Sequence, residues 1–320
     1  MDILYFLVQQ TAFFMIPLLV VALGGMFSER SGVVNIALEG IMTIGAFCSI
    51  LFINLMQKAN PEMNGQLLLI LAILVAVVAG MVFSLFHAYA AINMKADQVI
   101  SGTALNMFAP ALAIFAARML FGVQQIGFNN TFRIEKVPVL GDIPVIGPML
   151  FQKTYITTYI GIAILIVSTI VLYKTRFGLR LRSCGEHPQA ADSVGINVYR
   201  IRYSGVLISG ALAGVGGLIF VVPTSTNFNA TVAGYGFLAL AVLIFGQWNP
   251  MKIFYASLFF GFMKVVGTTY GSIPILKDLG IPGNVYKMVP YIATLLVLAF
   301  TSKKSQAPKA SGVPYDKGAR

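Results

Sequence analysis

The uncharged run from Tyr203 to Met251 reads YSGVLISGALAGVGGLIFVVPTSTNFNATVAGYGFLALAVLIFGQWNPM. As one helix, its 49 residues would extend over roughly 70 Å at about 1.5 Å per residue, whereas the hydrocarbon core of a bilayer is about 30 Å thick. The run must therefore break, and Pro223, Gly234 and Gly236 mark the position. This stretch predicts a membrane helix followed by a second, shorter helical segment.

The composition of the 320-residue chain excludes an ordinary soluble domain. Hydrophobic residues make up 58% and charged residues 10%, and the mean hydropathy is +0.83, whereas soluble domains carry roughly 25% charged residues. Lys and Arg total 22 against 11 Asp and Glu, an excess typical of loops on the anionic cytoplasmic side of a membrane. Those loops leave no continuous basic stripe, so nucleic-acid binding is not expected. Cys48 and Cys184 are expected at different depths, so neither a disulfide nor a metal site is predicted.

Apolar runs separated by charges and helix breakers predict an all-α, polytopic membrane bundle. A helix needs about 20 apolar residues to cross the hydrocarbon core. One transmembrane domain is expected over residues 1–301. Its nine helical segments are expected near residues 4–27, 33–56, 67–90, 99–121, 155–173, 204–224, 233–248, 252–271 and 286–301.

Positive charges predict the orientation of this bundle. Of the 22 Lys and Arg residues, 11 fall in the loop 174–203 and in the tail 302–320, and the positive-inside rule places both in the cytoplasm. Counting back five crossings from the loop puts the N-terminus outside, together with the loop 122–154. The tail is rich in Lys, Pro, Gly, Ala and Ser, so we expect a flexible end that stays in solvent.

Polar residues inside the segments are candidates for a substrate path. Asn35 and Glu39 are four residues apart, which places them on one face of the expected helix 33–56. A carboxylate there either faces the solute or joins an interhelical hydrogen-bond clamp, for which Arg30 is a candidate partner. Lys264 either contributes to the site or extends its ammonium group to the interface. The other path candidates are Ser101, Thr103, Asn106 and Phe237; for residues 101–106, hydrogen bonding between helices is the alternative.

Small residues and a repeated pattern add two predictions. The pairs Gly210/Gly214 and Ala213/Gly217 are spaced for close helix packing. The first segment, its break and the run 35–45 are similar to the sixth segment, its break and the run 236–246. The predicted orientation makes the first segment run inward and the sixth outward. The two halves are therefore predicted to be inverted repeats, which place a substrate path at their interface.

The loop 174–203 contains the start and stop signals of a short helix. His187-Pro188 is typical of a helix start and Gly195 of a stop, with about two turns between them. A helix this short needs a surface on which to pack. Either it rests on lipid head groups or it docks a soluble partner, and the arginines on both sides fit both interpretations.

Three runs occur in order along the chain: GMFSERSGVVNIALEGIM at 25–42; RFGLRLRSCGE at 176–186, with Ala190-Ala191, Gly195-Ile196-Asn197 and the run 207–214 after it; and the run 236–250. Together they resemble the permeases of bacterial ABC importers for simple sugars and nucleosides, over about residues 24–300. The resemblance is closest to the shorter of two permeases that form a heterodimer in nucleoside importers.

This resemblance implies a transport subunit in the bacterial plasma membrane, not an enzyme. Two permeases would enclose the path, a separate ATPase subunit would use ATP to drive alternating access, and an extracellular binding lipoprotein would deliver the solute. The chain itself would bind no cofactor. Residues Gln189 to Gly195 resemble the EAA loop of importers, with Gln in place of Glu and without its Leu-Pro pair. The resemblance implies ATPase contacts at Glu186, Pro188, Gln189, Ala190, Ala191 and Gly195.

Two other classes of function are alternatives to a transport subunit driven by a separate ATPase. The chain contains no G-x-x-x-x-G-K-[ST] phosphate loop, so it is not expected to hydrolyse ATP alone. A secondary transporter driven by an ion gradient would share the inverted repeats and Glu39, but it would not need a docking helix between its halves. A membrane-embedded enzyme would need His, Asp or Cys side chains that converge at membrane depth, and the only histidines of the chain are His87 and His187. Neither catalytic residues nor metal ligands are predicted.

Overall fold

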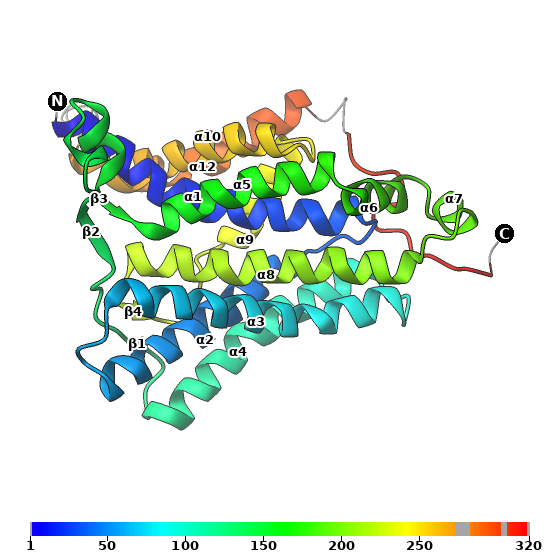
Figure 1. The fold of residues 1–320 in the computed structure, drawn as a ribbon, viewed down its shortest axis with the longest axis horizontal. Coiled ribbons are helices and arrows are strands. Elements are labelled where there is room, and N and C mark those ends of the chain that lie inside the picture. Colours follow the sequence, from blue (N-terminus) through cyan, green and yellow to red (C-terminus); the bar gives the residue numbers. More distant parts are fainter. Residues whose placement is uncertain (1, 273–281, 302–305, 319–320) are drawn as a thin grey trace.

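The computed structural model describes residues 2–272, 282–301 and 306–318, and shows a bundle of long helices (Figure 1). Each of the nine predicted segments overlaps a helix. Seven helices in the described residues are long and apolar enough to cross a membrane. These seven are α1 (Asp2–Arg30), α2 (Leu38–Ala59), α3 (Gly65–Ile92), α4 (Gln98–Phe121), α5 (Ile156–Lys174), α8 (Val198–Thr224) and α10 (Pro250–Thr269); the other two predicted segments are α9 (Tyr235–Phe245) and α12 (Gly283–Thr301).

The predicted positions of the two breaks in the helical pattern agree with the structure to different degrees. The break after α8 follows Pro223 directly, and Gly234, with a φ of 77°, precedes α9, as predicted. The first break is longer than expected, because a turn with Gly32 at a φ of 98° delays the start of α2 to Leu38. Asn35 therefore lies in the break, and the prediction that it shares a helical face with Glu39 is wrong.

Helix α8 lies in the middle of the bundle, against α1, α2 and α3. Glycines permit this approach: a Cβ at Gly214 would collide with the carbonyl oxygen of Ala76 in α3, and one at Gly217 with that of Met42 in α2. The predicted packing role of the small-residue pairs is confirmed. In addition, α2 packs on α8 while α9 packs on α1, so each helix that follows a break lies against the long helix of the other half.

The two ends of the bundle are built differently (Figure 1). At one end, two antiparallel ribbons form: β1 (Ile126–Gly127) pairs with β4 (Asn227–Phe228), and β2 (Arg133–Lys136) pairs with β3 (Gln152–Tyr155). The short turns η1 (Leu140–Asp142) and η2 (Gly147–Phe151) lie between β2 and β3. We call this the ribbon end. The opposite end carries α6 (Arg176–Glu186), α7 (Pro188–Ser193) and the described tail, and we call it the coupling end.

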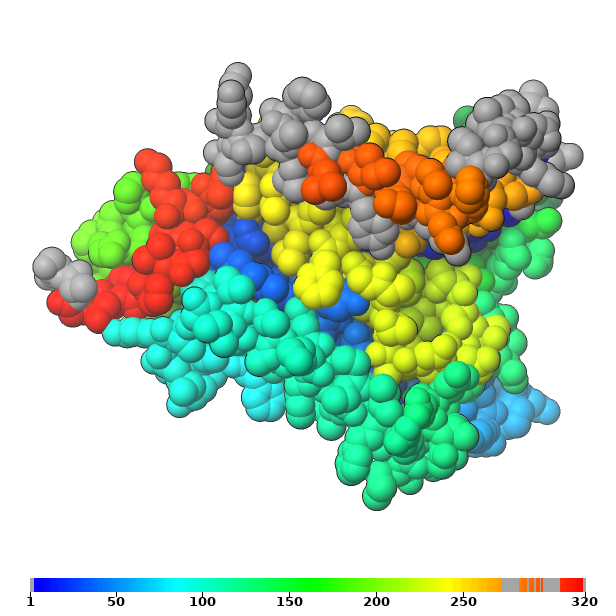
Figure 2. Space-filling view, turned by 180° about the vertical axis from the view of Figure 1, so that it is seen from behind, coloured from blue at the N-terminus to red at the C-terminus, as the bar shows by residue number. Residues whose placement is uncertain are grey.

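The described part of the tail, residues 306–318, packs on the coupling end, where Figure 2 shows it in red. The Ala310 amide donates to the Gly185 carbonyl oxygen at 2.8 Å, and Tyr315 is 5% exposed. The expectation of a solvated, flexible end is wrong for these residues. Helix ends present unpaired carbonyl oxygens and amides, and the tail meets them with its backbone, a partnership that composition does not reveal.

Candidate functional site

The carboxylate of Glu39 holds the N-terminus of α9. Its Oε1 accepts from the Gly234 amide at 2.9 Å and its Oε2 from the Gly236 amide at 2.6 Å. Amides at a helix N-terminus lack intrahelical partners and favour a negative charge. Because Glu39 itself lies in the first turn of α2, one side chain joins the two helices that follow the breaks. The clamp considered for Glu39 exists, with α9 as the partner in place of Arg30.

Asn35 fastens the first break to α8. The side chain is fully buried, its Nδ2 donates to Ser209 Oγ at 2.9 Å, and its Oδ1 accepts from the Ala37 amide at 3.1 Å. Both ends of the amide group are therefore used within the protein. The structure places Asn35 as a tie inside the bundle, and its contact with a solute stays a prediction.

Helix α4 supplies two more ties to the same break. Asn106 Oδ1 accepts from the Gly40 amide at 2.7 Å and its Nδ2 donates to the Ile36 carbonyl oxygen at 2.8 Å. Ser101 Oγ lies 2.7 Å from Nδ1 of His87, whose other ring nitrogen lies 2.8 Å from a main-chain oxygen of the break. These bonds satisfy backbone groups that the interrupted helix leaves free. Ser101 and Asn106 thus hold the break in shape.

Three further side chains lie nearer the surface of the bundle. Thr103 is exposed and its hydroxyl donates to the Val99 carbonyl oxygen of its own helix, while Phe237, on α9, is 51% exposed. Lys264 in α10 places Nζ 5.6 Å from the centroid of the Tyr235 ring. Figure 2 shows α4 and α9 bordering a strip where the N-terminal part of the chain (blue) reaches the surface.

A network at the coupling end ties α1 to the turn between α9 and α10. Glu29 is 7% exposed, and its Oε2 accepts from Trp248 Nε1 at 2.6 Å. Arg30 Nη2 donates to the Trp248 carbonyl oxygen at 3.0 Å, and its Nη1 lies 3.7 Å from Oε1 of Glu186 at the end of α6. Glu29 and Trp248 were not among the site residues predicted from the sequence. Two adjacent ionisable residues at the end of a long apolar run, and a single Trp in 320 residues, were the available signals.

Helix α6 packs against the short helix α7, and Cys184 and Ala191 lie in one buried cluster. Helix α6 was not predicted, although Phe177, Leu181 and Cys184 follow helical spacing; Leu181 and Cys184 are fully buried. Burial raises the pKa of the Cys184 thiol to about 11.

Helix α7 has the predicted boundaries. It begins with Pro188, and Gly195 after it has a φ of 85°. Pro188 and Ala191 are buried, whereas Gln189 and Ala190 are exposed. The helix therefore presents its second and third residues outward, and contact of this surface with an ATPase stays a prediction.

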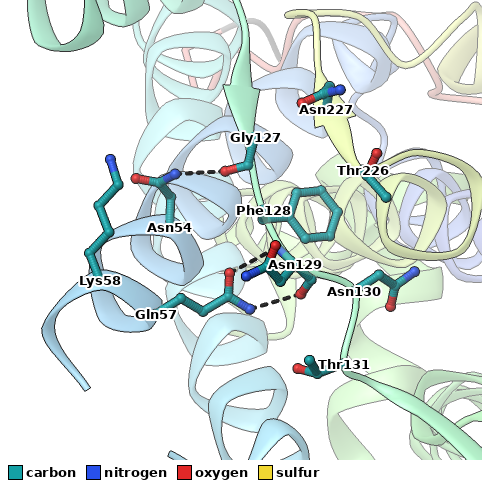
Figure 3. Close-up of a pocket in the computed structure, with 10 residues that line it drawn as sticks. All are labelled: Asn54, Gln57, Lys58, Gly127, Phe128, Asn129, Asn130, Thr131, Thr226 and Asn227. Carbon is teal, nitrogen blue, oxygen red and sulfur yellow. Dashed lines mark hydrogen bonds between the residues drawn. The ribbon is translucent and has the colours of Figure 1, made fainter. Parts of the chain in front are cut away.

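A pocket of about 690 Å³ opens at the ribbon end (Figure 3). Asn54 Nδ2 donates to the Gly127 carbonyl oxygen at 2.6 Å, and Gln57 Nε2 donates to that of Asn129 at 2.8 Å. None of these residues was predicted to form a solute site, because their amides come from segments far apart in the chain. The lining consists of Asn54, Gln57, Lys58, Gly127, Phe128, Asn129, Asn130, Thr131, Thr226 and Asn227.

Residues 7–298 match the family described as the permease component of the branched-chain amino acid transport system. The chain belongs to this permease family. It is 46% identical to the nucleoside ABC transporter permease protein NupC of Lactococcus lactis, over 94% of this chain and 93% of the relative. It is also 46% identical to the guanosine ABC transporter permease protein NupQ of Bacillus subtilis, over 100% and 99% of the two chains. No solved structure matches.

Family membership and the seven apolar helices make this permease a multi-pass membrane protein. Like its relatives it is a transport component and not an enzyme. Within the described residues, no group of three or more His, Cys, Asp or Glu side chains could hold a metal ion.

Proposed function

We propose that this permease is a membrane subunit of an ATP-driven importer that carries nucleosides into the bacterial cell. Two relatives whose names state nucleoside or guanosine transport align with nearly the whole chain. The structural observation that carries the proposal is the link from α7, through α6 and Arg30, to Trp248 beside α9. An importer driven by a separate ATPase needs such a link between its docking helix and its membrane helices.

The proposed mechanism centres on α9. A separate ATPase subunit binds ATP and contacts the exposed residues Gln189 and Ala190 of α7, so the permease itself needs no cofactor. Movement passes through the pair Glu186–Arg30 to the turn that follows α9. The 11-residue helix is held at that end by Arg30 and at its other end by Glu39. We infer that α9 moves as a unit and opens a path lined by Glu39, Thr103 and Phe237, while Asn35, Ser101 and Asn106 keep the first break in shape.

The topology and partners are proposed on the same basis. The positive charges of the coupling end support a cytoplasmic location for it in a plasma-membrane protein, with the ribbon end outside. The exchange of partners by α2 and α9 supports inverted repeats within a nine-span bundle. A second permease completes the path as a heterodimer. In support, NupB of L. lactis, named a nucleoside ABC transporter permease protein, is 25% identical over 94% of this chain. An extracellular binding lipoprotein delivers the solute.

Uptake by proteoliposomes tests this proposal. Vesicles contain the permease with its second permease and ATPase, and labelled guanosine is offered with the binding lipoprotein. We expect uptake that requires ATP, and a loss of at least about tenfold for Glu39→Ala with the complex still assembled. Glu39→Gln is the matched control that keeps the size and one acceptor. Proton-driven uptake by this chain alone, without ATP, would overturn the importer proposal and favour a secondary transporter.

A further inference from the structure

The pocket at the ribbon end has the dimensions of a small-molecule site. Its volume of about 690 Å³ falls within the range of roughly 300–1,000 Å³ that is typical of ligand pockets. Figure 3 shows Asn54 and Gln57 of α2 on one side and Thr226 and Asn227 on the other, with residues 127–131 between them. Because β1 pairs with β4, the walls come from segments about 100 residues apart that are fixed in register, Gly127 opposite Asn227.

The middle wall of the pocket is held before any ligand binds. Besides the two side-chain bonds to carbonyl oxygens, the Asn129 amide donates to Gln57 Oε1 at 3.0 Å, so Gln57 binds the backbone of this segment twice. Phe128 is 7% exposed and stacks on Phe132, with ring centroids 6.4 Å apart. A wall that is already ordered loses little conformational entropy on binding.

Polar groups of the lining remain available to a ligand. The side chains of Asn129, Thr226 and Asn227 line the pocket, and no residue in the described part of the chain forms a hydrogen bond with them. Amides and hydroxyls both donate and accept, which suits the hydroxyls of a sugar and the edge of a base.

The charge of the lining selects the class of ligand. The ten lining residues include one cation, Lys58, and no carboxylate, and the Lys58 ammonium group lies 5.0 Å from the ring centroid of Phe121. A zwitterionic amino acid, the substrate class in the family description, would leave its ammonium group without a counter-ion. We propose that this pocket is an outer binding site for a neutral, polyhydroxylated solute of the nucleoside class, occupied before the solute enters the membrane. The assignment of its transport role rests on the proposed function.

Direct binding to the assembled complex tests the proposal. The permease, its second permease and the ATPase are placed in nanodiscs without the binding lipoprotein and titrated with labelled guanosine. We expect saturable binding that unlabelled uridine displaces and leucine does not. Asn227→Ala and Asn129→Ala should each weaken binding about 3- to 10-fold, the value of one hydrogen bond. Asn60→Ala is the matched control, because this exposed amide lies in the same end of the molecule outside the lining.

The outcomes separate this inference from the proposed function. If the wild-type complex imports labelled guanosine with ATP but both pocket variants bind guanosine as tightly as the wild type does, the outer site is overturned and the importer stands. Displacement of guanosine by leucine overturns the assigned ligand class. If no nucleoside is imported at all, the proposed function itself fails. Size-exclusion chromatography of every variant shows that a loss of binding comes from an assembled complex.

Discussion

The coupling end and the ribbon end differ in the kind of polar side chain that joins distant segments. At the coupling end, cationic side chains bind carbonyl oxygens far away in the chain: Arg30, with a side chain 14% exposed, binds Trp248, 218 residues away, and Arg202, 1% exposed, donates to the Val313 carbonyl oxygen at 3.0 Å. At the ribbon end, neutral amides bind carbonyl oxygens, and the ion pair Lys136–Asp142 is exposed.

The difference follows from what each bond costs to break. Hydrogen bonds to ionised groups are roughly twice as strong as neutral ones, and a buried charge that loses its partner is left without solvation. Largely buried ionic ties therefore suit the transmission of movement that we propose between α7 and the membrane helices. Neutral amide ties can hold a wall in place while leaving polar groups free for an uncharged solute.

The largest effect is expected from Trp248→Phe at the coupling end. The change keeps an aromatic ring but removes the donor to Glu29, so a buried carboxylate loses its hydrogen bond. The complex should lose about 1.5–3 kcal/mol of stability. Denaturant or thermal unfolding of the purified complex measures this loss. A loss no greater than that of the ribbon-end variant below would contradict the comparison.

The next effect concerns the tail on the coupling end. Tyr315 is buried against Tyr199, with ring centroids 5.5 Å apart, in a cluster that covers Cys184. Tyr315→Ala should release the tail and raise the rate of maleimide labelling of Cys184 at least about tenfold, since burying such a ring contributes about 1.5–3 kcal/mol. Labelling is measured at neutral pH in a Cys48→Ala background. Tyr255→Ala, at a 63% exposed ring of α10, is the control and should leave the rate unchanged.

A smaller effect is expected at the ribbon end. Asn54→Ala removes one neutral bond, from Nδ2 to the Gly127 carbonyl oxygen, and should cost about 0.5–1.5 kcal/mol. The same unfolding measurement compares it with Asn60→Ala, which should change nothing measurable. Equal stability of Asn54→Ala and Asn60→Ala would show that the middle wall of the pocket is held by other contacts.

The smallest effect is expected from the surface ion pair between Lys95 and Asp316, at 2.7 Å. The hydrogen bond to Lys95 lowers the pKa of Asp316, and the same bond raises the pKa of Lys95. The pair therefore contributes fully at neutral pH, and the contribution is lost as the pH falls below the ordinary Asp value of about 4. The hydrogen-exchange protection factors of residues 306–318 should fall slightly in Lys95→Gln at pH 7, and they should no longer decrease as the pH drops below about 4. A fall as large as the one measured by the same method in Tyr315→Ala would contradict this order.

Much of the fold could be predicted because its signals are local. Nine apolar segments, the break at Pro223 and the ends of α7 all follow from side-chain hydropathy and from Pro and Gly at particular positions. Helix α6 escaped because its basic residues obscured the spacing of Leu181 and Cys184. The start of α2 was placed five residues early, since Gly32 sets a turn that the apolar pattern continues through.

Of the candidate site, the sequence located polar residues at membrane depth but not their partners. Glu39 was identified as a costly carboxylate, yet its bond to Gly236 joins residues 197 apart. Glu29, Trp248 and the amides of the ribbon-end pocket carry no local signal of the groups that they meet.

The sequence by itself determined that this protein is a membrane bundle of interrupted helices. A hydrocarbon core requires long apolar runs, and each run can be recognised from its own residues alone. The tertiary structure alone decided that Glu39 caps α9, that Arg30 joins three elements at the coupling end, and that neutral amides converge at the ribbon end. Hydrogen bonds depend on distance in space, and segments distant in the chain approach one another only after the helices have packed.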